Sequence, residues 1–206
     1  MVDAPYMLPH SWAWQALGKI FLYDAGTKRE PKTLVPTFWL LELEDIEKDT
    51  GRLLANARVS ERASQSTKSE FREGDILYGK LRPYLNKVLV ATEPGYSTTE
   101  IVALRPFLPL CSEYCALALL RTDFVEYVTR LGQGTKMPRL RTEDAVIAAF
   151  PIPPLAEQHR IVAKVDELMS LCDQLETQLT TTETDSRRLL EAVLHYALAP
   201  ALEAAA

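Results

Sequence analysis

The sequence of 206 residues has little cysteine and little histidine, three of each, and no hydrophobic run approaches the roughly 18 residues that a membrane span needs. Three cysteines agree with a reducing compartment rather than with a disulfide framework. No secretory signal peptide opens the chain. We therefore expect a cytoplasmic protein without a membrane partner. A hydrophobic content of 47% suits a globular chain that can bury a sound core.

Sequence patterns of common catalytic sites are also missing. The segment from Gly74 to Lys80 spells G-x-x-x-x-G-K, but Leu81 replaces the hydroxyl residue with which a P-loop holds magnesium. The chain has no glycine pattern of a dinucleotide-binding fold and no Asn/Asp-Pro-Pro-Tyr motif for amino-methyl transfer. Cys111 and Cys115 are one helical turn apart without a second ligand pair, which favours buried helix positions over zinc ligands. We predict a non-catalytic chain that binds no metal or cofactor itself.

Charge is unevenly distributed along a chain whose net charge is −5. Residues 1–57 hold 6 Lys and Arg against 8 Asp and Glu, a net charge of −2. Residues 58–141 hold 13 against 9, a net charge of +4, whereas residues 142–206 hold 4 against 11, a net charge of −7. Because phosphates repel acidic surfaces, the middle segment suits a nucleic-acid backbone and the acidic C-terminal segment suits a protein partner.

The first 150 residues have the pattern of an α+β domain. Residues 112–131 predict one or two helices, and Thr142 begins another, with acidic residues in its first turn. The polar residues 49–72 predict a long surface loop, and the three tryptophans are expected in the core. Short runs rich in β-branched and aromatic residues predict strands. These runs are residues 19–26, 37–43, 75–79, 86–92 and 100–106.

A long helix is predicted from Pro154 to Ala199, because Pro154 fits a first helical turn and no Gly or Pro follows before Pro200. Apolar residues recur in it at alternating steps of four and three, which is the pattern of a stripe that pairs with a facing helix. An ordinary amphipathic core helix is the alternative, but the length of the helix and the narrowness of the stripe favour a projecting coiled-coil helix. The apolar stripe consists of Ile161, Val165, Leu168, Cys172, Leu175, Leu179, Leu190 and Val193, with a break at Thr182 and Ser186.

Basic, amide and aromatic side chains gather at two turns of the predicted domain. Arg and Lys can bond guanine, Asn and Gln can read adenine, and all of them can hold phosphates. We predict that these residues bind DNA, and the pattern leaves open which of them contact bases, contact phosphates or only cover the surface. The first group is Lys80, Arg82, Tyr84, Asn86 and Lys87, and the second is Gln133, Thr135, Lys136, Arg139 and Arg141.

Several segments resemble, in order along the chain, the specificity subunits of type I restriction-modification systems. The most specific is LRTEDAVIAAF followed by PIPPLAEQHRIVAKVDELM, which is similar to the family's junction between target-recognition domain and conserved spacer helix. LPHSWAWQALGKI, GDILYGKLRPYLNKVLVA and GQGTKMPRLRTED are similar to the opening, the central segment and the Gly-Thr loop of such a domain. The resemblance implies a DNA target-recognition domain at 1–150 and a spacer helix at 151–206 that pairs antiparallel with an equivalent helix.

The same resemblance implies which partners the chain has. A complete family member carries two recognition domains and two spacer helices, so this chain is a half-length subunit or half of a longer one. It would read one half of a bipartite double-stranded DNA target, as a homodimer or beside a second recognition half. Methyltransferase subunits would bring S-adenosylmethionine, and a restriction subunit could join them.

Two other functions stay open from the residues alone. A coiled-coil adaptor would bind only protein and would show no salt-dependent binding to DNA. A stand-alone DNA-binding regulator would bind its site tightly without any methyltransferase.

Overall fold

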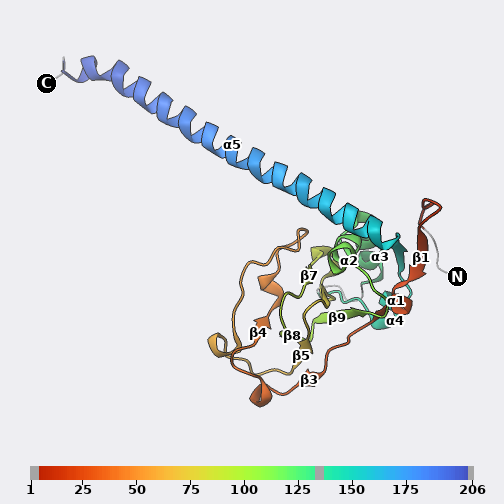
Figure 1. Cartoon of the computed structure of the whole chain (residues 1–206). Coiled ribbons are helices and arrows are strands. Elements are labelled where there is room, and N and C mark those ends of the chain that lie inside the picture. The colour runs from red at the N-terminus through yellow and green to blue at the C-terminus, as the bar shows by residue number, and fades with distance from the viewer. Residues whose placement is uncertain (1–4, 133–136, 204–206) are drawn as a thin grey trace. The chain divides into compact units, whose positions relative to one another are not determined.

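The computed structural model describes residues 5–132 and 137–203, with side chains up to residue 196. The chain divides into two compact units, residues 1–162 and residues 163–206. The first unit is mixed α and β (Figure 1). Its strands are β1 (Ala13–Ala16), β2 (Phe21–Leu22), β3 (Lys28–Arg29), β4 (Trp39–Leu41), β5 (Lys68–Phe71), β6 (Ile76–Gly79), β7 (Val88–Val90), β8 (Gly95–Thr98), β9 (Ile101–Pro106) and β10 (Ala149–Ile152). Its α-helices are α1 (Leu17–Ile20), α2 (Ser112–Leu119), α3 (Thr122–Leu131) and α4 (Thr142–Val146), and its short 3-10 helices are η1 (Pro31–Thr33), η2 (Leu43–Asp45), η3 (Val59–Glu61) and η4 (Pro83–Leu85).

The strands form three sheets. The central sheet has the order β2-β9-β6-β7 and is antiparallel throughout. A second sheet has the order β3-β5-β8-β4, in which only β4 and β8 run parallel. The strands β1 and β10 pair antiparallel and join the two ends of the domain. The predicted α+β class is confirmed.

The central strands β6 and β9 are buried on both faces. Ile76, Tyr78 and Val102 pack into a core that the α-helices cover, whereas Leu77 and Ile101 point into a second core against the other sheet. In Figure 1, α2 and α3 lie on one side of β9, and β3, β4 and β5 lie on the other. Because alternate residues of a strand face opposite ways, both faces need apolar residues here, which explains the nearly continuous hydrophobic runs of these strands.

Most of the predicted strands are confirmed with shorter bounds, but the strand expected at 19–26 is wrong over most of its length. The helix α1 extends to Ile20, β2 has only two residues, and Asp24 turns the chain with a φ of 56°. The predicted helical run 112–131 forms two helices, and α4 begins at Thr142 as expected.

The polar segment 49–72 is also not a surface loop throughout, because it ends in β5. Phe71 is fully buried in this strand, and so are the polar residues Lys68 and Ser69. The Lys68 ammonium lies 2.7 Å from Oε1 of Glu42, and this ion pair satisfies its charge inside the fold.

The tryptophans differ in their environments. Trp39 lies in the core as expected and is 1% exposed. The expectation is wrong for Trp12 and Trp14, which are only half-buried. The Trp14 indole donates a hydrogen bond to the Tyr6 carbonyl at 3.0 Å, and the Arg121 guanidinium lies 5.3 Å from the centroid of its ring. Contacts of this kind stabilise an aromatic side chain near the surface.

The long helix α5 spans Leu155–Glu203, and the predicted stop at Pro200 is wrong. Proline removes one backbone donor, and that loss does not end this helix. The first two turns belong to the first unit, where Ile161 and Val162 pack against the core. The buried Gln158 amide fixes this end, since its Oε1 accepts from the Cys111 N–H and its Nε2 donates to the Pro153 carbonyl, both at 2.9 Å.

Beyond Val162, α5 forms the second unit. Most of its large apolar side chains are exposed, from 47% for Leu171 to 83% for Tyr196, whereas Val165 is half-buried. Within the described residues, no helix is long and apolar enough to cross a membrane.

Candidate nucleic-acid interface

The first group of residues predicted to bind DNA lies on a segment that pairs with the segment of Arg139 and Arg141 from the second group. We call residues 80–87 and 137–141 the paired loops. Leu81 and Arg139 form an antiparallel bridge between them. On either side of this bridge the Arg82 N–H donates to the Pro138 carbonyl at 2.7 Å, and the Leu140 N–H donates to the Lys80 carbonyl at 3.0 Å. Backbone hydrogen bonds thus join residues that are more than 50 positions apart in the sequence.

The first loop turns tightly around η4. Arg82 and Asn86, on either side of η4, both have left-handed backbone, with φ of 51° and 47°. Pro83 is buried at the first position of this 3-10 helix, where a missing N–H costs nothing. This geometry leaves Tyr84 44% exposed.

Two of the predicted residues use their polar groups inside the fold. Asn86 is buried and donates from Nδ2 to the Leu120 carbonyl at 3.2 Å. The Lys87 ammonium donates to the Leu43 carbonyl at 2.7 Å. Both side chains therefore fix the first loop to neighbouring elements.

Glu100 connects the two loops. Its backbone carbonyl accepts from the Lys80 N–H at 2.9 Å, and its carboxylate accepts from Nε of Arg139 at 3.0 Å. The hydrogen bond that Arg139 donates to Glu100 raises the pKa of Arg139 above its ordinary value, so the guanidinium stays charged. The loop pattern in the sequence did not indicate Glu100, because its role depends on a contact 39 residues away.

The basic side chains of the paired loops differ in exposure. The side chains of Arg139 and Arg141 are about half exposed, at 49% and 52%, while Lys80 and Arg82 are partly buried. Arg141 lies 3.8 Å from Glu143 in the first turn of α4. Nε of Arg82 is buried and has no hydrogen-bond partner within the described part of the chain. The predicted residues Gln133, Thr135 and Lys136 lie outside the described residues.

The aspartate next to Gly74 has a structural role. Asp75 is buried at the start of β6, and its carboxylate accepts two hydrogen bonds from Arg105, at 2.8 and 2.7 Å. The hydrogen bond that Arg105 donates to Asp75 raises the pKa of Arg105. Among the described residues, no three His, Cys, Asp or Glu side chains gather as a metal site requires.

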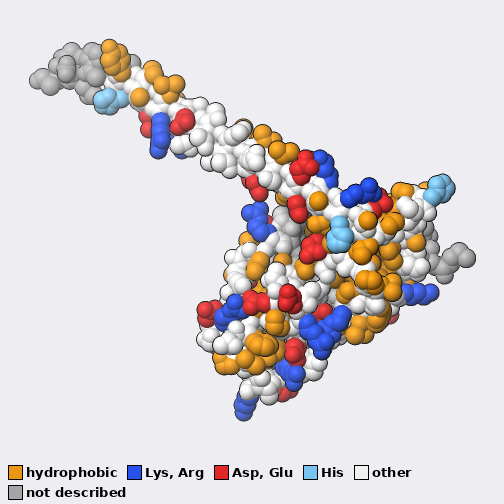
Figure 2. Space-filling model, in the orientation of Figure 1, with side chains coloured by type: hydrophobic (Ala, Val, Ile, Leu, Met, Phe, Trp, Pro, Cys, Tyr) orange, Lys and Arg blue, Asp and Glu red, His pale blue; other side chains and the backbone are white. Residues whose placement is uncertain are grey.

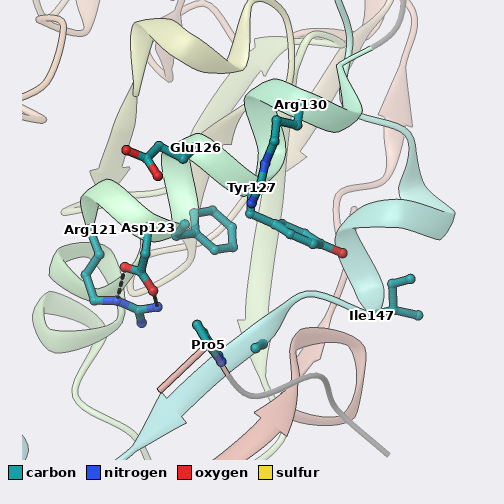
Figure 3. Close-up of a pocket in the computed structure, with 9 residues that line it drawn as sticks. Pro5, Arg121, Asp123, Glu126, Tyr127, Arg130 and Ile147 are labelled. Atoms are coloured by element: carbon teal, nitrogen blue, oxygen red, sulfur yellow. Dashed lines mark hydrogen bonds and ion pairs between the residues drawn. The ribbon is translucent and has the colours of Figure 1, made fainter. Parts of the chain in front are cut away.

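A separate pocket of about 390 Å³ lies beside α3, between this helix, β10 and the segment at Pro5 (Figure 3). Its wall contains the Arg121–Asp123 ion pair, whose atoms are 2.7 Å apart, and this pair lowers the pKa of Asp123. Glu126 and Arg130 also line the pocket, so its acidic and basic groups balance. A wall without net charge does not favour phosphate, in contrast to the paired loops.

Comparisons with known proteins show what the chain as a whole is similar to. The chain is 27% identical, over 91% of its length, to the Escherichia coli type I restriction enzyme EcoDI specificity subunit. It is also 27% identical, over 93% of its length, to the corresponding EcoAI subunit. The HsdS subunit from Thermoanaerobacter tengcongensis superposes with a TM-score of 0.73 at 25% identity over 95% of this chain. The chain is similar to type I specificity subunits. The resemblance predicted from the sequence is thus confirmed.

The similarity covers only part of each relative. The chain spans 41% of the EcoDI subunit and 51% of the T. tengcongensis HsdS chain. A chain from a structure of the type I R-M system has a TM-score of 0.71 and is covered over 50% of its length. No family model matches the sequence. The mixed α and β unit with its long helix therefore corresponds to between two fifths and about half of these relatives.

Proposed function

We propose that this chain recognises a DNA sequence as the specificity component of a type I restriction-modification enzyme. The observation that carries the proposal is the similarity to named specificity subunits over more than nine tenths of the chain, in sequence and in fold. In this proposal the chain performs no chemistry, and it reads one half of a bipartite double-stranded target.

The paired loops are the proposed DNA-binding surface. Lys80, Arg82 and Arg139 come together there from distant parts of the sequence, and their charge suits a phosphate backbone or a guanine edge. Tyr84 offers an exposed ring and phenol beside them. Gln133, Thr135 and Lys136 immediately precede the second loop in the sequence and belong to the same proposal, as does Arg141.

Asn86 and Lys87 take a different part in this proposal. Their hydrogen bonds to backbone carbonyls leave them fewer donors for DNA, so they hold the loop in place for its neighbours. The Asn86 amide is buried and is therefore not a base reader in this account.

The second unit provides the proposed contact with other subunits. The exposed apolar stripe of α5 would pair antiparallel with an equivalent helix and hold two recognition domains at a fixed separation. Methyltransferase subunits, with bound S-adenosylmethionine, would dock beside the paired helices, and a restriction subunit could join them. The net charge of −7 over residues 142–206 supports a protein partner rather than DNA along this segment.

Selection of bound sequences from a random DNA pool, with and without the cognate methyltransferase subunit, tests the proposal. Enrichment of a defined half-site in the complex is the expected result. Enrichment at high affinity without any methyltransferase would favour a stand-alone regulator, and indifference to DNA at every salt concentration would favour a protein-binding adaptor.

A further inference from the structure

The polar break in α5 gives information about how the helix pairs. Figure 2 shows hydrophobic side chains in two stretches of α5, separated by a stretch of other side chains. In the sequence, the residues from Thr180 to Arg188 contain no hydrophobic side chain, and the apolar residues resume at Leu189. The Thr180 and Thr182 hydroxyls donate hydrogen bonds to backbone carbonyls one turn earlier, at 2.9 and 2.8 Å. Their polar groups therefore have an acceptor within the helix itself.

The break does not disturb the spacing of the stripe. Steps of three and four from Leu179 reach Thr182, then Ser186, then Leu189, so both polar residues occupy stripe positions. Such a 3.5-residue repeat stays on one face of a supercoiled helix. We call the residues at this spacing the heptad positions. They are Ile161, Val165, Leu168, Cys172, Leu175, Leu179, Thr182, Ser186, Leu189, Val193 and Tyr196.

We propose that α5 pairs antiparallel with a second copy of itself, about a two-fold axis at Thr184. The antiparallel direction rests on the proposed function, whereas the register follows from the residues of this chain. With the axis at Thr184, the two polar positions face each other, and the apolar heptad positions between Cys172 and Tyr196 face one another. The facing pairs are Thr182 with Ser186, Leu179 with Leu189, Leu175 with Val193, and Cys172 with Tyr196.

Most other registers mix polar and apolar layers. Moving the partner by one heptad, for example, places Leu175 opposite Ser186 and Leu179 opposite Thr182. A layer in which leucine faces threonine or serine buries less apolar surface than a layer of two apolar side chains, which is unfavourable. A polar residue at a single heptad position is a known way of fixing the register of a coiled coil.

One other register avoids these mismatches, with its axis at Ser170. It would use Ile161 opposite Leu179, but Ile161 already packs against the core of the first unit. It would also leave the 67% exposed Leu189 without a partner. Fewer apolar layers are therefore buried than with the axis at Thr184.

The charges near the two possible axes also favour the register with its axis at Thr184. Next to Thr184 lie Glu183, Asp185, Arg187 and Arg188, whose charges cancel. The charged residues within six positions of Ser170 are Lys164 against Asp166, Glu167, Asp173 and Glu176, a net charge of −3. Two copies that meet at Thr184 bring no net charge together, whereas two copies that meet at Ser170 repel each other.

The native Cys172 allows a direct test. It is the exposed cysteine among the three, since Cys111 and Cys115 are buried. In the proposed register it faces position 196 of the second copy, so Tyr196→Cys should cross-link two full-length chains on mild oxidation. Leu168→Cys is the matched control, because it faces Cys172 only when the axis lies at Ser170. After trypsin digestion, the expected product joins the peptide 165–187 to the peptide 189–206.

Each outcome decides between arrangements. Cross-linking of Tyr196→Cys, with only background cross-linking in the parent and in Leu168→Cys, supports the register. Cross-linking of Leu168→Cys alone moves the axis to Ser170, and cross-linking of the parent through Cys172 shows parallel pairing; both overturn the proposal. A dimer that cross-links in no variant shows another register and also overturns it.

Failure of this register differs from failure of the proposed function. A chain that sediments as a monomer overturns both the register and the helix pairing. The proposed DNA recognition fails only if the separate selection experiment finds no preferred sequence. Adding Thr182→Leu and Ser186→Leu to the Tyr196→Cys chain replaces the two polar heptad residues by leucine. Other registers are then no longer disfavoured, so cross-linking between Cys172 and position 196 should fall although the dimer persists. Unchanged cross-linking there would show that the two polar residues do not set the register.

Discussion

At the scale of single residues, the side chains of the first loop divide into those that hold the loop and those that face solvent. Asn86 is buried, has a left-handed backbone and donates to the Leu120 carbonyl. Tyr84, two residues earlier, has an exposed ring. Residue type alone made both of them candidates for DNA binding, and burial separates them.

Replacing Asn86 tests its structural role. Asn86→Ala should lower the free energy of unfolding by about 1–3 kcal/mol, because the buried hydrogen bond is lost and alanine is strained at this φ. Asn86→Gly keeps the backbone conformation and should lose less. Urea unfolding measures both effects. If Asn86→Ala is as stable as the parent but loses its preferred DNA sequence, the amide reads a base.

Arg139 and Glu100 form a matched pair for testing the interface. Arg139→Ala should weaken binding to all DNA sequences and reduce the slope of log affinity against log salt by about one unit, as a lost phosphate contact does. Glu100→Gln removes the carboxylate that competes with phosphate for Arg139, so binding should become tighter. Fluorescence anisotropy in the complex with the methyltransferase subunit, over a range of salt, measures both. Unchanged affinity and salt slope in both variants would place the interface elsewhere.

The cysteines should differ strongly in reactivity. Burial raises the pKa of Cys115 to about 12, and burial also raises the pKa of Cys111. Because the thiolate is the nucleophile, both thiols should resist iodoacetamide at pH 8, whereas exposed Cys172 should be alkylated quickly. Peptide mass spectrometry, with a urea-unfolded sample as the control, measures this order. Alkylation of Cys115 as fast as Cys172 in the folded protein would contradict the burial of α2.

At the scale of elements, the hydrophobic pattern predicted β6 and β9 because these strands bury apolar residues in continuous runs, and it predicted β7 although only Val88 is buried there. It missed β5, whose buried residues include Lys68 and Ser69, since the partner that satisfies Lys68 is Glu42, 26 residues earlier. A pattern of hydrophobicity does not contain such a tertiary contact.

The candidate site shows the same limit of local reasoning. Both loops were found from their turn residues and charges, but their pairing depends on the bridge between Leu81 and Arg139. Asn86 was assigned to DNA because its acceptor, the Leu120 carbonyl, is 34 residues away in the sequence. The order of family-like segments, rather than local propensity, was the feature that carried the function.

The stripe of α5 should be needed for association. Leu175→Asp places a charge in a proposed apolar layer and should convert dimers into monomers, because burying an unpaired carboxylate is costly. Thr177→Asp lies on another face of the same helix and should leave the dimer intact. Sedimentation of the full chain measures both, and circular dichroism checks the helix content. A parent chain that is itself monomeric would remove the basis for helix pairing.

At the scale of the whole molecule, the proposed pair of identical chains related by a two-fold axis would present two identical recognition domains. Because an isologous pair is symmetric, both half-sites must then carry the same sequence on opposite strands. If the chain instead works beside a different recognition half, the target is asymmetric and this chain accounts for one part of it.

The central claim is that this chain reads a DNA sequence. The most direct measurement is the selection of DNA from a random pool by the full chain in complex with its methyltransferase subunit, followed by sequencing. The account predicts an interrupted palindrome, with two inverted half-sites separated by a gap of fixed length. Recovery of DNA without any enriched sequence, from a complex that is assembled and folded, would contradict the claim.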